Sequence, residues 1–253
     1  MSLLNLRPLW IALWLMSRFP VPYLGPVEPA ETGRSVPWYP FVGLLIGLAT
    51  GLTAVALSGL GTDPGVAAAV VLVVWVWLSG ALFLDGLADT ADAWVGGIGS
   101  RERTLEIMKD PHSGPIAVTT LVLVLIAKWA GLQALIAAGA TWVIVAIPML
   151  GRAQVLAVLL STPYARERGM AADQSRELPR RATRGAIVAT TGGVLLLARW
   201  SGLAMILTAA ALFLVARRTM LKRIAGFTGD TAGALVELTE AVILLVCVLL
   251  LRP

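Results

Sequence analysis

Two groups of carboxylates lie far apart in the sequence, each beside a strongly apolar segment. The first stands in FLDGLADTADAW (83–94) and the second in TGDTAGALVELTE (228–240). The members of the two groups are Asp85, Asp89, Asp92, Asp230, Glu237 and Glu240. At roughly 100° of rotation per helical residue, each group spans less than about 80° of its own helix. The spacing therefore predicts two helical stripes of carboxylates.

Carboxylates at helical-turn spacing on two helices are hard oxygen ligands, suited to Mg²⁺ or Mn²⁺. Mg²⁺ takes further ligands from water and from substrate phosphates. The pattern therefore indicates phosphoryl transfer, in which a metal neutralises developing charge and a carboxylate accepts the proton of an attacking hydroxyl. The alternative is that these residues are only solvated, or paired with nearby arginine and lysine at a membrane surface.

The elements that would carry these residues are membrane helices. The chain has 253 residues, of which 58% are hydrophobic and 14% charged, and its mean hydropathy is +0.83. Because no unpaired backbone group can face lipid, apolar runs of about 20 residues predict an all-α, polytopic membrane bundle. We expect one membrane-embedded domain over residues 1–253, with seven spans at about 37–60, 66–95, 115–132, 134–160, 184–199, 202–219 and 231–251.

Residues 1–35 are expected to form an interfacial amino-terminal segment. Its helix, 8–17, is short for a span, and Trp10 and Trp14 suit the headgroup boundary. The segment resembles a signal peptide, but Arg7 and Pro8 interrupt it and no cleavage site follows. We therefore expect it to be retained.

The basic residues predict the orientation of the bundle. With a cytoplasmic amino terminus, all of the 20 lysines and arginines except Lys128, Arg199 and Arg252 belong to the cytoplasmic side. Both carboxylate groups then lie on that side. The net charge of +5 is accordingly a topology signal and does not indicate nucleic-acid binding. The basic loop 161–184 could cover an anionic substrate, enforce topology or contact anionic lipid.

Further charged residues are candidates for substrate contacts. In RERTLEIMKDPHSG (101–114), Glu106 and Asp110 lie one turn apart, and Lys109 and His112 could contact phosphate. A solvated loop helix is the alternative for this segment. Lys128 could reach the opposite interface or point into a polar cavity, and Arg152 could project into the same site. The lone Cys247 excludes a disulfide within the chain, and no P-loop or Rossmann fingerprint is present.

Six segments together resemble the motifs of the cobalamin synthases, a family of adenosylcobinamide-GDP ribazoletransferases. They are SRFPVP (17–22), RSVPWYPFVGLLIGL (34–48), LDGLADTADAW (84–94), RERTLEIMKD (101–110), PYARERGM (163–170) and TGDTAGALVELTE (228–240). The resemblance implies a Mg²⁺-dependent enzyme of the prokaryotic inner membrane, and the basic residues predict that its amino terminus and active site lie on the cytoplasmic side. Such an enzyme joins adenosylcobinamide-GDP to α-ribazole or α-ribazole 5′-phosphate and releases GMP.

The resemblance also suggests roles for individual residues. The six carboxylates would bind Mg²⁺ around the diphosphate, with Asp92 or Glu237 as the base. The expected substrate contacts are Arg18, Arg34, Glu106, Lys109, Asp110, Lys128 and Arg152. The chain departs from the family pattern at Phe83, where a histidine is common, and at 111–112, where Pro-His replaces Ser-Arg.

Two rival functions share these features. Another membrane phosphotransferase, of the type that joins a nucleotide-activated group to a lipid alcohol, would show the same metal chemistry. In a cation-coupled transporter or a precursor-binding protein the carboxylates would form an ion pathway, although their position at one face disfavours transport. The sequence allows homo-oligomers but fixes no number of subunits.

Overall fold

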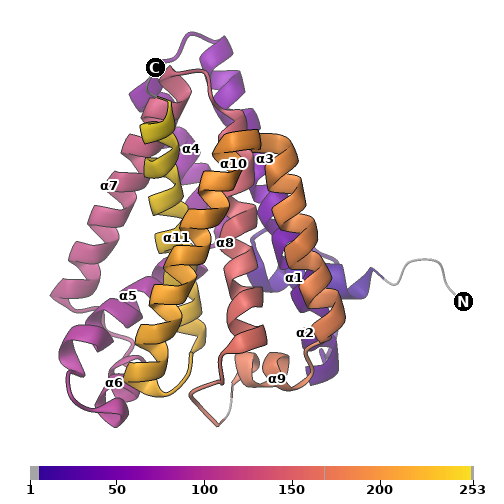
Figure 1. Cartoon of the computed structure of the whole chain (residues 1–253), viewed down its shortest axis with the longest axis vertical. Helices are drawn as coiled ribbons and strands as arrows, with labels where there is room; N and C mark the ends of the chain where they lie inside the picture. The colour runs from indigo at the N-terminus through magenta and orange to yellow at the C-terminus, as the bar shows by residue number, and fades with distance from the viewer. Residues whose placement is uncertain (1–5, 168, 252–253) are drawn as a thin grey trace, which may run out of the picture.

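The computed structural model describes residues 6–167 and 169–251. Every regular element in this part of the chain is a helix, which confirms the expected all-α fold. The elements are α1 (Arg7–Met16), α2 (Pro29–Ser35), η1 (Val36–Trp38), α3 (Tyr39–Gly59), α4 (Pro64–Ser79), α5 (Leu82–Gly96), α6 (Arg101–Ile107), α7 (Pro115–Ala137), α8 (Trp142–Ser161), α9 (Met170–Arg176), α10 (Arg180–Ile224) and α11 (Gly229–Leu250). The long helices stand side by side (Figure 1).

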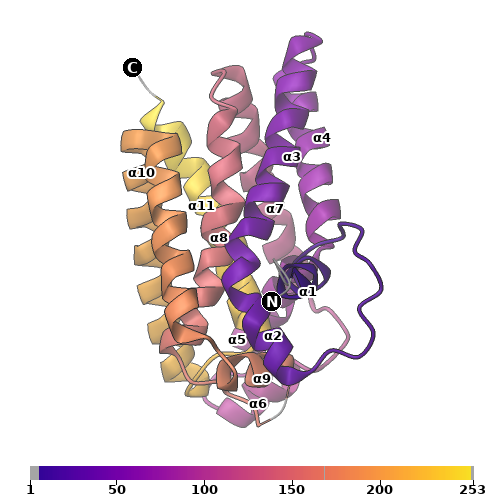
Figure 2. The same ribbon diagram turned by 90° about the vertical axis from the view of Figure 1, so that its right-hand side faces the viewer.

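Helix α8 lies at the centre of the bundle and packs against α3, α10 and α11 (Figures 1 and 2). Two glycines allow α3 to approach it closely. A Cβ atom on Gly43 would lie 2.4 Å from the carbonyl oxygen of Pro148, and one on Gly47 would lie 2.2 Å from that of Val145. Small residues at such crossings are the usual device of membrane helix packing, because lipid supplies no hydrophobic drive between helices.

Helix α10 is a hairpin, not one straight rod. Arg180 donates to the carbonyl of Leu160 at 3.3 Å, and Arg217 donates to that of Ser161 at 2.9 Å, so both arms end beside the end of α8. A straight helix would separate residues 180 and 217 by about 55 Å. The backbone leaves the helical conformation at Arg199, whose φ is 47°. Figure 1 shows the two arms of α10 meeting at the end away from α9. The two arms correspond to the expected spans at 184–199 and 202–219.

The number of candidate crossings follows from these helices. Five stretches of the described chain are long and apolar enough to span a membrane by themselves, and α4 with α5 makes a sixth. One of the five is the 45-residue α10. Counting its two arms separately, and α4 with α5 as one span, would give seven, so the expected number of crossings stays a prediction.

The span expected over 66–95 is not a single helix. Helices α4 and α5 meet at an angle of 88°. Gly80 and Ala81 between them both adopt the left-handed conformation, with φ of 65° and 56°, which an α-helix cannot continue through. Gly80 also leaves room for Arg18, whose Nε would lie 2.5 Å from an added Cβ. The first carboxylate group therefore lies on a separate short helix.

Helix α1 lies crosswise to the long helices and is seen end-on in Figure 2. It buries Ile11, Ala12, Leu13 and Met16, while Trp14 is 53% exposed. One apolar face therefore packs on the bundle and a tryptophan remains on the other. Its place in the headgroup region of a bilayer stays a prediction.

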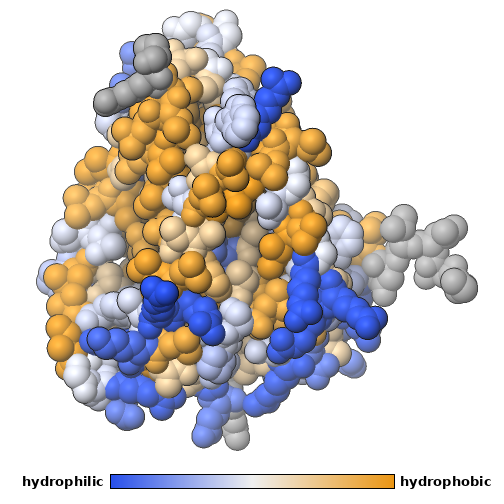
Figure 3. Space-filling model, in the orientation of Figure 1, coloured by the Kyte–Doolittle hydropathy of each residue, from blue (hydrophilic) through white to orange (hydrophobic). Residues whose placement is uncertain are grey.

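Hydrophilic side chains gather at the end of the bundle where α2, α6 and α9 lie (Figures 1 and 3). The basic loop 161–184 belongs to this end, although Arg168 lies outside the described residues. At the opposite end, the loops 60–63, 138–141 and 199–201 contain only Asp63 and Arg199 as charged residues. Arg252 is also outside the described part. We call the first end the charged end.

Candidate functional site

Helices α5 and α11 carry the two carboxylate motifs and cross in close contact near the charged end. A Cβ on Gly86 would lie 2.8 Å from the carbonyl oxygen of Asp230, and one on Gly233 would lie 3.3 Å from the ring of Phe83. Each motif therefore supplies a glycine at which the other helix approaches. This crossing brings the start of α11 beside the first turns of α5.

Three carboxylates and one arginine form what we call the acidic cluster: Asp85, Asp89, Asp230 and Arg166. Asp89 interacts electrostatically with all three of the others. Arg166 Nη2 lies 3.0 Å from Asp230 Oδ2, which also accepts from the Thr228 hydroxyl at 3.2 Å. Asp85 is exposed and Asp89 half-buried, and neither side chain makes a hydrogen bond or ion pair with another described residue. The cluster thus holds two uncommitted carboxylates.

Asp92, one turn beyond Asp89, is engaged elsewhere. Its Oδ2 accepts from the backbone N–H of Gly114, and its Oδ1 accepts from that of Ala117 at 2.9 Å. These N–H groups belong to the start of α7, where a helix leaves donors unpaired and its dipole favours negative charge. Asp92 therefore caps α7 from a neighbouring helix.

Glu237 and Glu240 form a second group with Lys128 of α7 and Arg152 of α8, which we call the buried ion-pair cluster. The Lys128 ammonium lies 2.6 Å from Glu237 Oε2 and 2.6 Å from Glu240 Oε2, and Arg152 pairs with Glu240. All four residues are at most 3% exposed. Two positive and two negative formal charges make the cluster neutral, as its burial requires.

Aromatic rings cover the two cations of the buried ion-pair cluster. Lys128 Nζ lies 4.9 Å from the centre of the Trp75 ring, and Arg152 Cζ lies 5.0 Å from that of Phe83. Phe83 thus forms an apolar cover over Arg152. Lys128 does not reach the opposite interface, because it points into the bundle.

The structure therefore divides the six predicted metal ligands among three places. Asp85, Asp89 and Asp230 share the acidic cluster, Asp92 caps α7, and the two glutamates lie in the buried ion-pair cluster. Glu237 is seven residues beyond Asp230, or about 10 Å further along the helix axis, so a shared helix face does not give a shared depth. Among the described residues, no three His, Cys, Asp or Glu side chains are already arranged to hold a metal ion.

A cavity of about 220 Å³ opens beside the acidic cluster. Its walls come from the end of α1 and from α5, α8, α9 and α11, together with residue 227. Of the side chains that line it, only Asp85, Gln174 and Asp230 are polar. Sequence reasoning missed this cavity because five separate helices build it. It did not single out Arg166, although that arginine lies in the PYARERGM segment (163–170).

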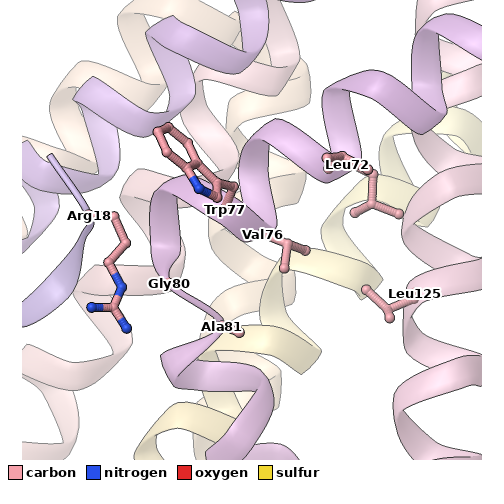
Figure 4. Close-up of a pocket in the computed structure, with 8 residues that line it drawn as sticks. Arg18, Leu72, Val76, Trp77, Gly80, Ala81 and Leu125 are labelled. Atoms are coloured by element: carbon pink, nitrogen blue, oxygen red, sulfur yellow. The ribbon is translucent and has the colours of Figure 1, made fainter.

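The other predicted substrate contacts lie around this region without joining the acidic cluster. Arg18 follows α1 and borders an open apolar notch of about 710 Å³. Figure 4 shows it beside Gly80 and Ala81, with Leu125 on the far side of the notch. Arg34 is exposed on α2, beside Trp38 of η1 and the start of α10.

The segment after α5 carries its charges in solvent. Glu106 pairs with Arg103 at 2.8 Å, Asp110 pairs with His112 at 2.7 Å, and Lys109 is exposed. The hydrogen bonds that His112 makes to Asp110 lower the pKa of this carboxyl group. None of these three expected contacts reaches the acidic cluster in this structure.

Comparison with known proteins gives a consistent result. The family described as cobalamin-5-phosphate synthase matches residues 8–248. An adenosylcobinamide-GDP ribazoletransferase of Pseudomonas savastanoi pv. phaseolicola is 49% identical over 244 residues, which cover 96% of this chain and 99% of that protein. The protein of the same name from Pseudomonas entomophila is 49% identical over 237 residues, covering 94% of this chain and 96% of its own length. No solved structure matches the chain.

Proposed function

The chain belongs to the cobalamin-5-phosphate synthase family, and on this premise we propose that its acidic cluster is the active site of an adenosylcobinamide-GDP ribazoletransferase. The enzyme is a transferase of cobalamin biosynthesis. Its substrates are adenosylcobinamide-GDP and α-ribazole or its 5′-phosphate. The family and the transferase activity expected from the sequence motifs are thus confirmed.

The reaction exchanges one phosphorus–oxygen bond for another. A ribose hydroxyl of the ribazole attacks the phosphorus next to the cobinamide arm, and the bond from that phosphorus to the bridging oxygen breaks. GMP leaves with the bridging oxygen, and the hydroxyl proton passes to a base. The site must therefore hold a diphosphate, balance its charge and accept one proton.

The observation that carries this proposal is the convergence of Asp85, Asp89 and Asp230 with Arg166 where α5 crosses α11. The three carboxylates are the hard oxygen donors that suit Mg²⁺, and Asp85 and Asp89 have no competing described partner. A Mg²⁺ ion bound there would neutralise charge on the diphosphate in the transition state. We assign Asp85 and Asp230 to hold the ion.

Two other residues of the acidic cluster have distinct roles in this scheme. Arg166 pairs with Asp230 through one nitrogen at 3.0 Å and can turn to a phosphate oxygen when that carboxylate binds a cation. Asp89 is half-buried and uncommitted, which suits it to accept the hydroxyl proton. It replaces Asp92 and Glu237 in that role, because one caps a helix and the other is paired with Lys128.

The buried ion-pair cluster positions α11 for this chemistry. It ties Glu237 and Glu240 to α7 and α8, two to three turns from Asp230 along the same helix. Lys128 and Arg152 are therefore positioning residues in our proposal and do not contact phosphate. The helix that carries Asp230 is held by four neighbours, since α5 and α10 pack on it as well.

We also propose that the charged end faces the cytoplasm of the producing cell and that the bundle sits in its inner membrane. The concentration of basic residues at that end supports this orientation through the positive-inside rule. The active site would then be accessible to the nucleotide-activated substrate in the cytosol.

The test is GMP release by purified protein in lipid vesicles with adenosylcobinamide-GDP, α-ribazole 5′-phosphate and Mg²⁺. We expect release to require both substrates and to fall by a factor of about 100 or more in Asp89→Asn, the loss typical of a removed acid–base group. Glu102→Gln is the matched control, because Glu102 is exposed on α6 and its carboxylate hydrogen-bonds only to Ser100 among the described residues. Full activity of Asp89→Asn and Asp85→Asn would refute the acidic cluster as the active site. If folded wild-type protein releases no GMP, the proposed function is refuted.

A further inference from the structure

The proposed transfer reaction assigns no role to the cavity beside the acidic cluster. It lies on the side of the α5–α11 crossing where α1, α8 and α9 close over it. Asp85 and Asp230 belong both to its wall and to the acidic cluster. A molecule that filled the cavity would therefore reach the reacting phosphorus with its exposed end.

The wall of the cavity is suited to an apolar ring. Its aromatic and long aliphatic members include Leu15, Met16, Phe83, Leu159, Met170 and Phe227. Only Gln174 supplies a neutral polar group, and its amide already donates to the Tyr39 hydroxyl at 2.8 Å. A ligand whose edge carries several hydrogen-bonding groups would leave them unpaired there, at a cost of roughly 1–3 kcal/mol each.

The size of the cavity limits the candidates further. A cavity of about 150 Å³ lined by aliphatic and aromatic side chains accepts benzene. A volume of about 220 Å³ therefore has room for a somewhat larger ring system. A corrin macrocycle with its amide arms is several times too large.

The bases and the macrocycle of the two substrates make four large ring systems. The corrin is excluded by volume, and guanine and the adenine of the adenosyl group are disfavoured because their edges carry several donors and acceptors. The remaining ring is the dimethylbenzimidazole of α-ribazole, which is planar and bicyclic and has two methyl groups at its outer edge. Burying this apolar surface is worth about 25 cal/mol per Å².

We propose that this cavity binds the dimethylbenzimidazole base of α-ribazole and so directs the ribose hydroxyl at the acidic cluster. The inference rests on the proposed function, since it names the subsite for the attacking substrate. Phe83, Leu159 and Phe227 contact the base, and Asp85 and Asp230 stand at its ribose end. The side chains at Ala171 and Ala232, which line the cavity, set how large a base can enter.

The test uses variants with a smaller cavity and measures for which substrate the KM changes. Ala232→Leu on α11 and Ala171→Leu on α9 each add three carbons to a different wall. We expect either variant to raise the KM for α-ribazole 5′-phosphate by about tenfold or more, the size expected for a misfit of a few methyl groups. We expect the KM for adenosylcobinamide-GDP to stay unchanged. The KM for a ribotide with unsubstituted benzimidazole should rise less than the KM for the dimethylated one.

The matched control is Ala91→Leu, because Ala91 lies on α5 but lines a different cavity. Binding of α-ribazole itself, followed by its benzimidazole fluorescence with protein in nanodiscs, gives a readout that does not depend on turnover. We expect wild type and the control to bind it and the two reduced-cavity variants to bind it more weakly.

The outcomes separate this inference from the proposed function. If wild-type protein turns over both substrates but both reduced-cavity variants keep the wild-type KM for every ribotide, the subsite is refuted and the function stands. The subsite is also refuted if the KM rises equally for the dimethylated and the unsubstituted ribotide, or if only the KM for adenosylcobinamide-GDP rises. If folded wild-type protein turns over no ribotide, the proposed function itself has failed. Size-exclusion chromatography identifies a variant that does not fold, and the other variant then decides.

Discussion

The Lys128 ammonium contacts the Glu237 carboxylate at 2.6 Å, although 109 positions separate the two residues in the sequence. The contact lies inside the bundle, where Lys128 is 1% and Glu237 is 3% exposed. Glu240 extends it to Arg152, so three helices are joined through four charges. A neutral group of this kind holds its helices in one arrangement, because any other arrangement would bury an unpaired charge.

Replacing one member of the buried ion-pair cluster should destabilise the protein strongly. Lys128→Met leaves two buried carboxylates with one arginine, and an uncompensated buried charge costs about 3–5 kcal/mol. We expect a lower thermal unfolding midpoint in detergent. The double variant Lys128→Met/Glu237→Gln restores charge balance and should recover part of the loss. A midpoint that the single variant does not lower would mean that the pair contributes nothing to stability.

The crossing of α5 and α11 should be sensitive to a single methyl group. In Gly86→Ala the new Cβ would meet the Asp230 carbonyl oxygen at 2.8 Å, so the helices must separate and the acidic cluster must widen. We expect slower GMP release from protein that still folds. Gly192→Ala is the control, because its Cβ would meet nothing within 4 Å and alanine favours a helix more than glycine does. Equal turnover in both variants would show that the crossing tolerates the extra carbon.

Asp92 should act on stability through its cap of α7. Asp92→Ala removes the acceptor for the backbone N–H groups of Gly114 and Ala117, and a lost cap costs about 1 kcal/mol. We expect a lower unfolding midpoint, with turnover falling only as folded protein is lost. Asp92→Asn keeps one oxygen acceptor and should fall between wild type and Asp92→Ala. A fully stable Asp92→Asn protein without turnover would instead place this carboxylate among the reacting groups.

The orientation in the membrane can be checked across a single helix. Ser113 precedes α7 at the charged end, and Ala138 follows it at the other end, and both are exposed. Single cysteines at these positions, in a Cys247→Ser background, should react differently with a membrane-impermeant maleimide added to intact spheroplasts. We expect Ala138→Cys to be labelled and Ser113→Cys to be labelled only after lysis. The reverse pattern would place the acidic cluster outside the cytoplasm.

Much of the architecture could be predicted from the sequence because its causes are local. The cost of an unpaired backbone group in lipid makes every apolar run a helix, so composition and length suffice to predict the crossings. The hairpin at Arg199 was visible as two adjacent spans. The break at Gly80 and Ala81 was not, since the left-handed backbone there depends on what packs around it, including the side chain of Arg18.

The sequence by itself determined the membrane class, the helical fold, the family and the two carboxylate motifs. Only the tertiary structure decided how those carboxylates are used. Helical spacing tells which residues share a face of one helix, but it does not tell how deep each lies or which helix stands opposite. Asp230 meets Asp85 and Asp89 because α11 begins where α5 crosses it. Glu237 and Glu240 lie deeper, where a carboxylate persists only beside a cation, and the packing of α7 and α8 supplies Lys128 and Arg152.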